Sequence, residues 1–190
     1  MARPKRIDLP FCLYHVFSRT NSGDVAFESR TEEELFLNYL ARYSRLLSMR
    51  IHAYCLMHNH FHLLVESGQI AALSEFMRRL LTSFTVNINR NRQRHGHLFQ
   101  GRFKSLVVDK SGYFLTVARY IHLNPAGVDG DLDPVKYPGS SLKFYVNGGE
   151  PEFLHTQEIL AWFDGDREKH LDFVMEGLTE ETAPPILQQR

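Results

Sequence analysis

The stretch Met57-His58-Asn59-His60-Phe61-His62-Leu63-Leu64-Val65 alternates polar and apolar side chains after a short polar pair. Successive side chains of a β-strand point to opposite faces, so this alternation predicts a strand from His60 to Glu66, with His58 and Asn59 in the tight turn before it. His60 and His62 would share one face with Leu64. The opposite, core-facing side would consist of Phe61, Leu63 and Val65.

Two side chains on one face of a strand, two positions apart, have Cβ atoms roughly 6–7 Å apart, which lets two imidazoles bind one metal ion. A solvated strand face that happens to carry histidines is the ordinary alternative. Three histidines at strand spacing, opposite a fully apolar side, disfavour that alternative. The pattern therefore indicates a site built on His60 and His62.

Hydrophobic periodicity divides the rest of the chain into strands and helices. Predicted strands cover residues 11–18, 50–57, 60–66 and 105–109, and predicted helices cover residues 31–49, 71–92 and 111–125. Thr31-Glu32-Glu33-Glu34 resembles a capping box and predicts the start of the first helix. Pro125 is expected to end the third helix.

The predicted order β-α-β-β-α-β, followed by a helix, is the split βαβ, ferredoxin-like arrangement of an α+β protein with a central antiparallel sheet. The last helix can lie across the open face of that sheet. Tyr120 and Asn124 are four residues apart and therefore neighbours on one helix face. We expect this helix to bring them towards His60 and His62.

Two domains are predicted: a catalytic domain of residues 1–148 and an acidic, helical C-terminal extension of residues 149–190. Residues 129–149 are rich in turn-forming residues. The extension should contain short helices at residues 156–163 and 166–177, separated at Gly165. Residues 179–190 are expected to fray.

The charges are unevenly distributed along a chain with 22 Lys+Arg and 22 Asp+Glu. Residues 1–127 hold 17 basic and 9 acidic side chains, residues 128–190 hold 5 and 13, and residues 76–108 hold seven basic and no acidic ones. Such a block is typical of a polyanion-binding face, since ordinary exposed helices mix signs.

Basic and aromatic side chains alternate between residues 93 and 104, which suits single-stranded nucleic acid, with charges on phosphates and rings against bases. The predicted DNA-contacting residues are Arg19, Arg78, Arg79, Arg94, His97, Phe99, Arg102 and Lys104.

The composition also argues against a membrane-spanning protein and favours a cytoplasmic location. No run approaches 18 apolar residues, so no transmembrane helix and no membrane partner are expected. Cys12 and Cys55 lack metal-ligand spacing and are interpreted as reduced, buried thiols. We expect a cytoplasmic, nucleoid-associated protein.

Two imidazoles and an amide oxygen with open positions would suit Mg²⁺ or Mn²⁺ better than structural zinc. Such an ion binds phosphate oxygens and offsets charge in the transition state. Tyr120 could then attack a phosphodiester once its phenol, with an ordinary pKa of about 10, loses its proton. A phosphotyrosine keeps the energy of the broken bond, so the expected outcome is strand transfer. Alone, Tyr120 would be interpreted as a half-buried helix residue.

Four segments in this order resemble the REP-associated tyrosine transposases, part of the single-tyrosine HUH superfamily, over roughly residues 8–145. The segments are Tyr14-His15-Val16-Phe17-Ser18-Arg19, Tyr54 to Val65 (YCLMHNHFHLLV), Gly96 to Ser105 (GHLFQGRFKS) and Arg119-Tyr120-Ile121-His122-Leu123-Asn124-Pro125. His-Phe-His alone would be a weak signal.

The resemblance implies that His60 and His62 form the HUH pair and that Tyr120 makes a 5′-phosphotyrosine with single-stranded DNA. Asn124 falls where relatives carry a third, amide metal ligand. The implied substrates are short imperfect palindromes that fold as REP-like hairpins, and the implied state is a monomer or a homodimer. The chain departs from the family pattern at residues 126–130 and at Gly139, where a tryptophan is common.

Two other functions remain open at this stage. His58-Asn59-His60-Phe61-His62-Leu63-Leu64 also resembles the histidine-triad pattern of nucleotide hydrolases and transferases, although Asn59 is polar where that pattern has an apolar residue. That hypothesis leaves Tyr120, Asn124 and the basic block unexplained. The other function is a catalytically silent regulator that binds hairpin DNA.

Overall fold

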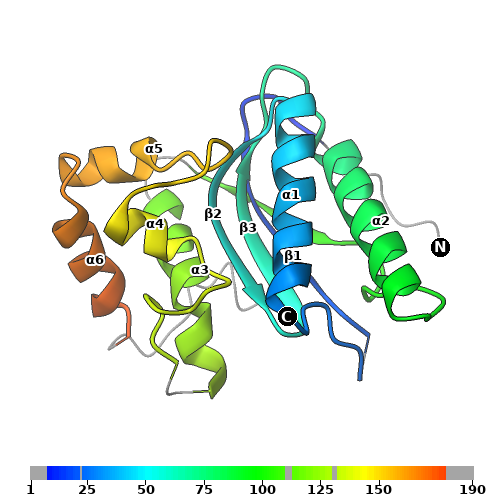
Figure 1. Cartoon of the computed structure of the whole chain (residues 1–190). Coiled ribbons are helices and arrows are strands. Elements are labelled where there is room, and N and C mark those ends of the chain that lie inside the picture. The colour runs from blue at the N-terminus through cyan, green and yellow to red at the C-terminus, as the bar shows by residue number, and fades with distance from the viewer. Residues whose placement is uncertain (1–7, 22, 110–112, 130–131, 179–190) are drawn as a thin grey trace.

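The computed structural model describes residues 8–21, 23–109, 113–129 and 132–178. Figure 1 shows helices on both sides of a four-stranded sheet, with α1 and α2 on one face and α3 to α6 on the other. The strands are β1 (Leu13–Arg19), β2 (Arg50–Met57), β3 (His60–Glu66) and β4 (Lys104–Val108). The helices are α1 (Arg30–Leu46), α2 (Leu73–Asn91), α3 (Tyr113–Asp129), α4 (Leu142–Asn147), α5 (Gln157–Leu160), the 3₁₀ turn η1 (Ala161–Phe163) and α6 (Arg167–Glu176).

The strands lie in the order β2-β3-β1-β4, and every neighbouring pair is antiparallel. This order, with α1 and α2 as the two crossovers, is the ferredoxin-like split βαβ topology. The predicted α+β class and antiparallel sheet are confirmed, as is a helix, α3, that packs on β2 and β3.

The alternation of β3 separates two apolar clusters. Phe61, Leu63 and Val65 are fully buried in the cluster beneath α1 and α2. Leu64 points the other way, into the cluster beneath α3. His58 and Asn59 form the predicted two-residue turn before β3. The strand therefore presents one face to a core and the other to α3.

The start of α1 lies earlier than predicted. Ser29, not Thr31, is the N-cap: its backbone is extended and its side chain accepts a hydrogen bond from the Glu32 amide. The Glu32 carboxylate in turn accepts a hydrogen bond from the Glu28 amide at 2.7 Å. The first helical turn thus uses a Ser-x-x-Glu pair two residues ahead of the predicted one.

The end of α3 also differs from the prediction. Pro125 lies inside the helix, which continues to Asp129. A proline removes only its own N–H from the helical ladder, here the usual partner of the Ile121 carbonyl, and residues 126–129 stay helical despite that loss. The predicted start at Ser111 and the frayed end at 179–190 lie outside the described residues.

The free edge of β2 is covered by the chain between residues 137 and 155. Three backbone hydrogen bonds join β2 to this segment: the Leu56 amide donates in one, and the carbonyls of Tyr54 and Ile51 accept in the other two. They are Leu56 N to Gly139 O at 2.9 Å, Ser141 N to Tyr54 O at 3.0 Å and His155 N to Ile51 O at 2.8 Å. The segment contains α4, which the turn-rich composition did not predict.

The two predicted helices of the extension are present, with η1 completing the first and Gly165 separating them. They share an apolar cluster with the α3 face of the sheet. Its members include Ile159, Leu160 and Val174 of the extension, Leu142 and Tyr145 of α4, and Val117, Ala118 and Ile121 of α3. The domain boundary at residue 148 stays a prediction.

Replacing Gly139 with alanine should destabilise the protein. A Cβ there would lie 2.6 Å from the Leu56 carbonyl oxygen and 2.9 Å from the Tyr137 ring, so backbone must move. We expect Gly139→Ala to lower the free energy of unfolding in urea by about 1–3 kcal/mol. Lys136→Ala, at a side chain 85% exposed in the same segment, is the control. A Gly139→Ala protein as stable as wild type would contradict the close approach.

His170 should make stability fall at mildly acidic pH. Burial, and then the charge of Arg167, lowers its pKa from 6.5 to about 4. The unfolded chain therefore binds a proton that the folded chain rejects, so stability is lost as pH drops below about 6.5. Between pH 7 and pH 5 we expect this residue to account for up to about 2 kcal/mol.

Urea unfolding at both pH values tests this contribution. His170→Phe should reduce the difference between pH 7 and pH 5, whereas His58→Gln, in the exposed turn, should leave it unchanged. Equal pH dependence in wild type and His170→Phe would refute the assignment.

Candidate active site

A row of side chains crosses the sheet beneath α3, set by the pairing of four strands. Phe17 of β1 lies opposite His62 of β3 on one side and Lys104 of β4 on the other. Cys55 of β2 lies opposite His62 from the far side. The row thus runs Cys55, His62, Phe17, Lys104. In the next row, Arg19 lies opposite His60.

The two histidines of β3 each use Nδ1 to contact a neighbouring side chain. Nδ1 of His60 lies 2.8 Å from Oδ1 of Asn59, and the His60 and His62 ring centroids are 5.2 Å apart. Nδ1 of His62 lies 2.8 Å from Nε2 of His15. The nitrogen that these contacts leave to other partners is Nε2 in both rings.

His15 belongs to β1 and is buried directly beneath the site. Its ring lies edge to edge with that of His62, with centroids 5.1 Å apart and planes at 15°. Burial lowers the pKa of His15 to about 4, so this ring is neutral near pH 7. Its Nδ1 has no hydrogen-bond partner within the described part of the chain.

Tyr120 projects from α3 onto the imidazoles of His62 and His15. Its ring centroid lies 5.5 Å from that of His62 and 5.9 Å from that of His15, edge-on to both. Four residues later on α3, Asn124 donates from Nδ2 to the Tyr120 carbonyl at 2.8 Å. That bond occupies the amide nitrogen, and Oδ1 is the atom of Asn124 that could meet a cation.

The residues of this site fit a hard divalent cation. Two imidazole Nε2 atoms and an amide oxygen would be a mixed nitrogen and oxygen set that leaves positions open for phosphate oxygens and water. In both histidines Nδ1 is engaged by a neighbour, which is how metal-binding imidazoles are usually oriented. Within the described ranges, this site included, His, Cys, Asp and Glu do not gather in threes that could hold a metal ion, so a third ligand here would be the amide of Asn124.

Several basic residues predicted to contact DNA already pair with acids. Arg78 and Arg79 both bind Glu75, at 2.7 Å and 2.6 Å. Arg94 binds Asp24 at 2.9 Å. Residues 76–108 contain no acidic side chain, but their arginines pair with Glu75, just before this segment, and with Asp24, in the loop after β1.

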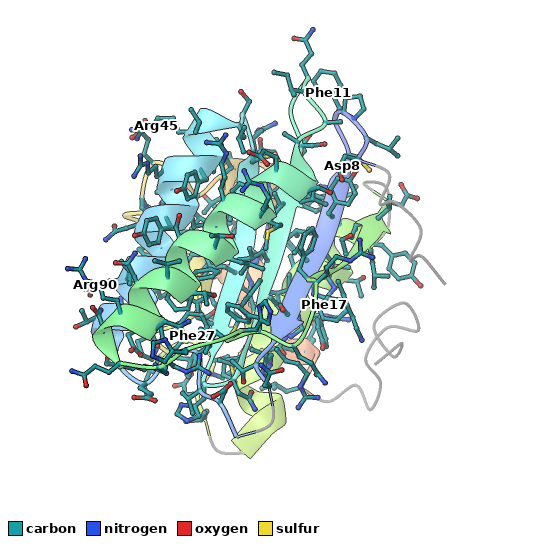
Figure 2. All side chains as sticks on the ribbon, turned by 90° about the vertical axis from the view of Figure 1, so that its right-hand side faces the viewer. Asp8, Phe11, Phe17, Phe27, Arg45 and Arg90 are labelled. Carbon is teal, nitrogen blue, oxygen red and sulfur yellow. The ribbon has the colours of Figure 1, made fainter. Side chains whose placement is uncertain are left out.

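Other predicted DNA contacts lie exposed near the site. Arg19, His97, Arg102 and Lys104 are exposed. Within the described ranges no acid pairs with Arg19, Arg102 or Lys104. Lys104 holds its Nζ 5.7 Å from the centre of the Phe17 ring. Figure 2 shows Phe17 near the end of β1 remote from Phe11.

Phe99 was predicted to contact DNA, but its ring is buried. It is only 6% exposed and packs edge-on against Phe61 with ring centroids 5.6 Å apart. A bridge between Thr20 and Phe99 holds the loop against the end of β1. The ring therefore contributes to the core beneath α2 and offers almost no surface to a base.

Sequence reasoning missed His15 and Phe17. Residues 13–18 read as a strand, but the faces of a single strand do not reveal which residues of another strand lie beside them. The register of β1 with β3, Phe17 opposite His62, is a long-range property of the sheet. The one available signal was that both residues belong to a segment that resembles the transposase motif.

Comparison with known proteins places the chain in a family. The family model for IS200-like transposases matches residues 9–124. The match covers well over half of the chain, and the chain belongs to the IS200-like transposases. None of the curated proteins compared with the chain matches it.

A solved structure shows the same fold, and a second is similar over a smaller part of the chain. A REP-associated tyrosine transposase bound to a REP hairpin superposes with a TM-score of 0.67 at 15% identity, covering 82% of this chain and 92% of that one. A protein of Deinococcus radiodurans described as a transposase gives a TM-score of 0.44 at 14% identity, covering 57% of this chain and 88% of that one. Among the described residues, no helix is long and apolar enough to cross a membrane.

Proposed function

We propose that the protein cleaves and rejoins single-stranded DNA beside REP-like hairpins, with Tyr120 as the nucleophile. The observation that carries this proposal is the position of the Tyr120 ring, 5.5 Å from that of His62. A tyrosine placed on a core-facing side of α3 would serve packing alone. Here its ring lies edge-on to His62 and His15, on the sheet face that also carries Phe17 and Lys104.

The reaction is a transesterification that balances without a further reagent. The Tyr120 oxygen attacks phosphorus, its proton leaves to solvent, and a phosphotyrosine bond forms at the 5′ end of one strand piece. The bond from phosphorus to the 3′ oxygen breaks, and that oxygen takes up a proton. A second 3′ hydroxyl can reverse the step and join a new strand.

We assign cation binding to His60, His62 and Asn124. A bound Mg²⁺ or Mn²⁺ would supply positive charge against the phosphate as negative charge develops on it. The protein's own contribution is geometric. His60 and His62 stand on a rigid strand, and α3 holds the phenol beside them, so attacking and accepting atoms are ordered in advance.

For phosphate binding we assign the leading role to Arg19, Arg102 and Lys104, which border the site. His97 belongs to the same exposed loop. Arg78, Arg79 and Arg94 can contribute only by exchanging an acid for a phosphate. The related fold in complex with a REP hairpin supports hairpin DNA as the partner.

Tyr120→Phe should abolish covalent attachment while leaving hairpin affinity largely unchanged, because one hydroxyl is lost and the ring packing stays. Denaturing gels after incubation with hairpin oligonucleotides and Mn²⁺ measure the adduct, and gel shifts measure binding. Tyr113→Phe, at the exposed start of the same helix, should still form the adduct.

Three results would count against the proposal. Cleavage by Tyr120→Phe would exclude this nucleophile. Hairpin binding by the wild type without any adduct would identify a silent regulator. Turnover of adenosine phosphoramidates with neglect of the hairpin would favour the histidine-triad reading of residues 58–64.

Salt should weaken hairpin binding, because phosphate contacts release counterions. Lys104→Ala should lower affinity for all hairpin sequences alike and reduce the slope of log K against log salt by about 1. Arg79→Ala should change the slope less, since Arg79 is already bound to Glu75. Fluorescence anisotropy at several salt concentrations measures both slopes. Equal slopes for wild type and Lys104→Ala would remove Lys104 from the interface.

A further inference from the structure

We infer that His15 is a positioning residue for His62: when a cation is bound, Nε2 of His15 accepts the Nδ1–H of His62, so that Nε2 of His62 faces the cation. The inference rests on the proposed function, because it concerns a cation held by His60 and His62. It adds a residue from another strand, one with no assigned role in the reaction.

Within the described part of the chain, the His15 ring makes one hydrogen bond, to His62. Nε2 of His15 and Nδ1 of His62 are 2.8 Å apart, and His15 is 1% exposed. Its centroid lies 5.0 Å from that of Phe17 and 5.1 Å from that of His62, and those two rings are 5.7 Å apart, so all three rings are mutual neighbours. The edge of Tyr120 closes the remaining side at 5.9 Å. Close-packed rings of this kind hold their orientation.

The direction of the hydrogen bond decides whether His62 can bind a cation. A neutral imidazole has one N–H and one lone pair. If His15 donates, Nδ1 of His62 accepts and the proton of His62 sits on Nε2, which excludes a cation there. If His62 donates from Nδ1, its Nε2 carries the lone pair that a metal ion needs.

His60 shows the second arrangement with a partner that can only accept. Oδ1 of Asn59 takes a hydrogen bond from Nδ1 of His60 at 2.8 Å. His15 would do for His62 what Asn59 does for His60. Both imidazoles would then present Nε2, which a shared cation requires.

Cation binding should therefore reorient the proton between the two rings. When His15 accepts at Nε2, its own proton lies on Nδ1, which is buried and has no partner in the described part of the chain. That is unfavourable without a cation, so the metal-free pair should favour donation by His15. A cation at Nε2 of His62 reverses the bond.

Metal affinity of the full chain without DNA tests the inference. Mn²⁺ binding, followed by electron paramagnetic resonance, should weaken about 10–100-fold in His15→Phe, which keeps a flat ring and removes the acceptor. His15→Gln, whose amide oxygen can accept the same hydrogen bond, should recover most of the affinity. His170→Phe, which changes a similarly buried histidine away from His60 and His62, should bind as wild type does.

If circular dichroism shows that His15→Phe does not fold, a measurement on the wild-type protein tests the inference instead. Nitrogen-15 NMR of labelled histidines reports which ring nitrogen carries the proton. On addition of Mg²⁺, His62 should show a protonated Nδ1 and an unprotonated Nε2. A proton on Nε2 of His62 in saturating Mg²⁺ would overturn the inference.

The outcomes separate this inference from the proposed function. Wild-type Mn²⁺ affinity in a folded His15→Phe protein, or equal losses in His15→Phe and His15→Gln, would overturn the role of His15 while DNA cleavage by the wild type still stood. A selective loss in His15→Phe, with no DNA adduct in the wild type, would support His15 and refute strand transfer. Absence of Mn²⁺ and Mg²⁺ binding in the wild type would overturn both.

Discussion

The packing of α3 on β2 and β3 determines where the candidate nucleophile lies. Val117, Ala118 and Ile121 of this helix are buried against the sheet. Tyr120 precedes Ile121 and so falls at the edge of that contact, over His62 rather than inside the cluster. A helix rotated by one residue would bury the phenol or turn it to solvent. Apolar contact therefore sets the geometry on which the proposed chemistry depends.

The other side of α3 is held by the C-terminal extension. A Cβ on Gly177 would lie 2.8 Å from Leu123 and 2.9 Å from Arg119, so the end of α6 approaches α3 closely. The guanidinium of Arg119 lies 4.6 Å from the centre of the Phe173 ring. Arg119 directly precedes Tyr120 in the chain. The C-terminal extension thus helps to fix the helix that carries the phenol.

Much of the fold could be predicted from the sequence, because the faces of strands and helices depend on residues close together in the chain. The alternation at residues 60–65 assigned each side chain of β3 to its observed face. Prediction from local signals failed where contacts between distant parts of the chain determine the local structure. Pro125 stays helical, and α4 forms within a turn-rich segment whose backbone is bonded to β2. Ser29 caps α1 where the run of acids after Thr31 suggested otherwise.

The same limit explains the site. The pairing of Tyr120 with the histidine strand could be anticipated from topology, because one helix had to cover the open face. His15, Phe17 and the partners of Arg78, Arg79 and Arg94 could not. The absence of acids from residues 76–108 did not predict free arginines, because Asp24, from another loop, forms an ion pair with Arg94. Phe99 lies in a basic loop, yet a bridge to Thr20 turns its ring into the core.

The most direct measurement is a crystal structure of the full chain soaked in Mn²⁺, with anomalous scattering used to locate the ion. The account predicts an anomalous peak bound by Nε2 of His60 and Nε2 of His62, on the side of the sheet where the Tyr120 phenol lies. A peak at a different site, or an ion between the histidines with Tyr120 turned away from it, would contradict the account.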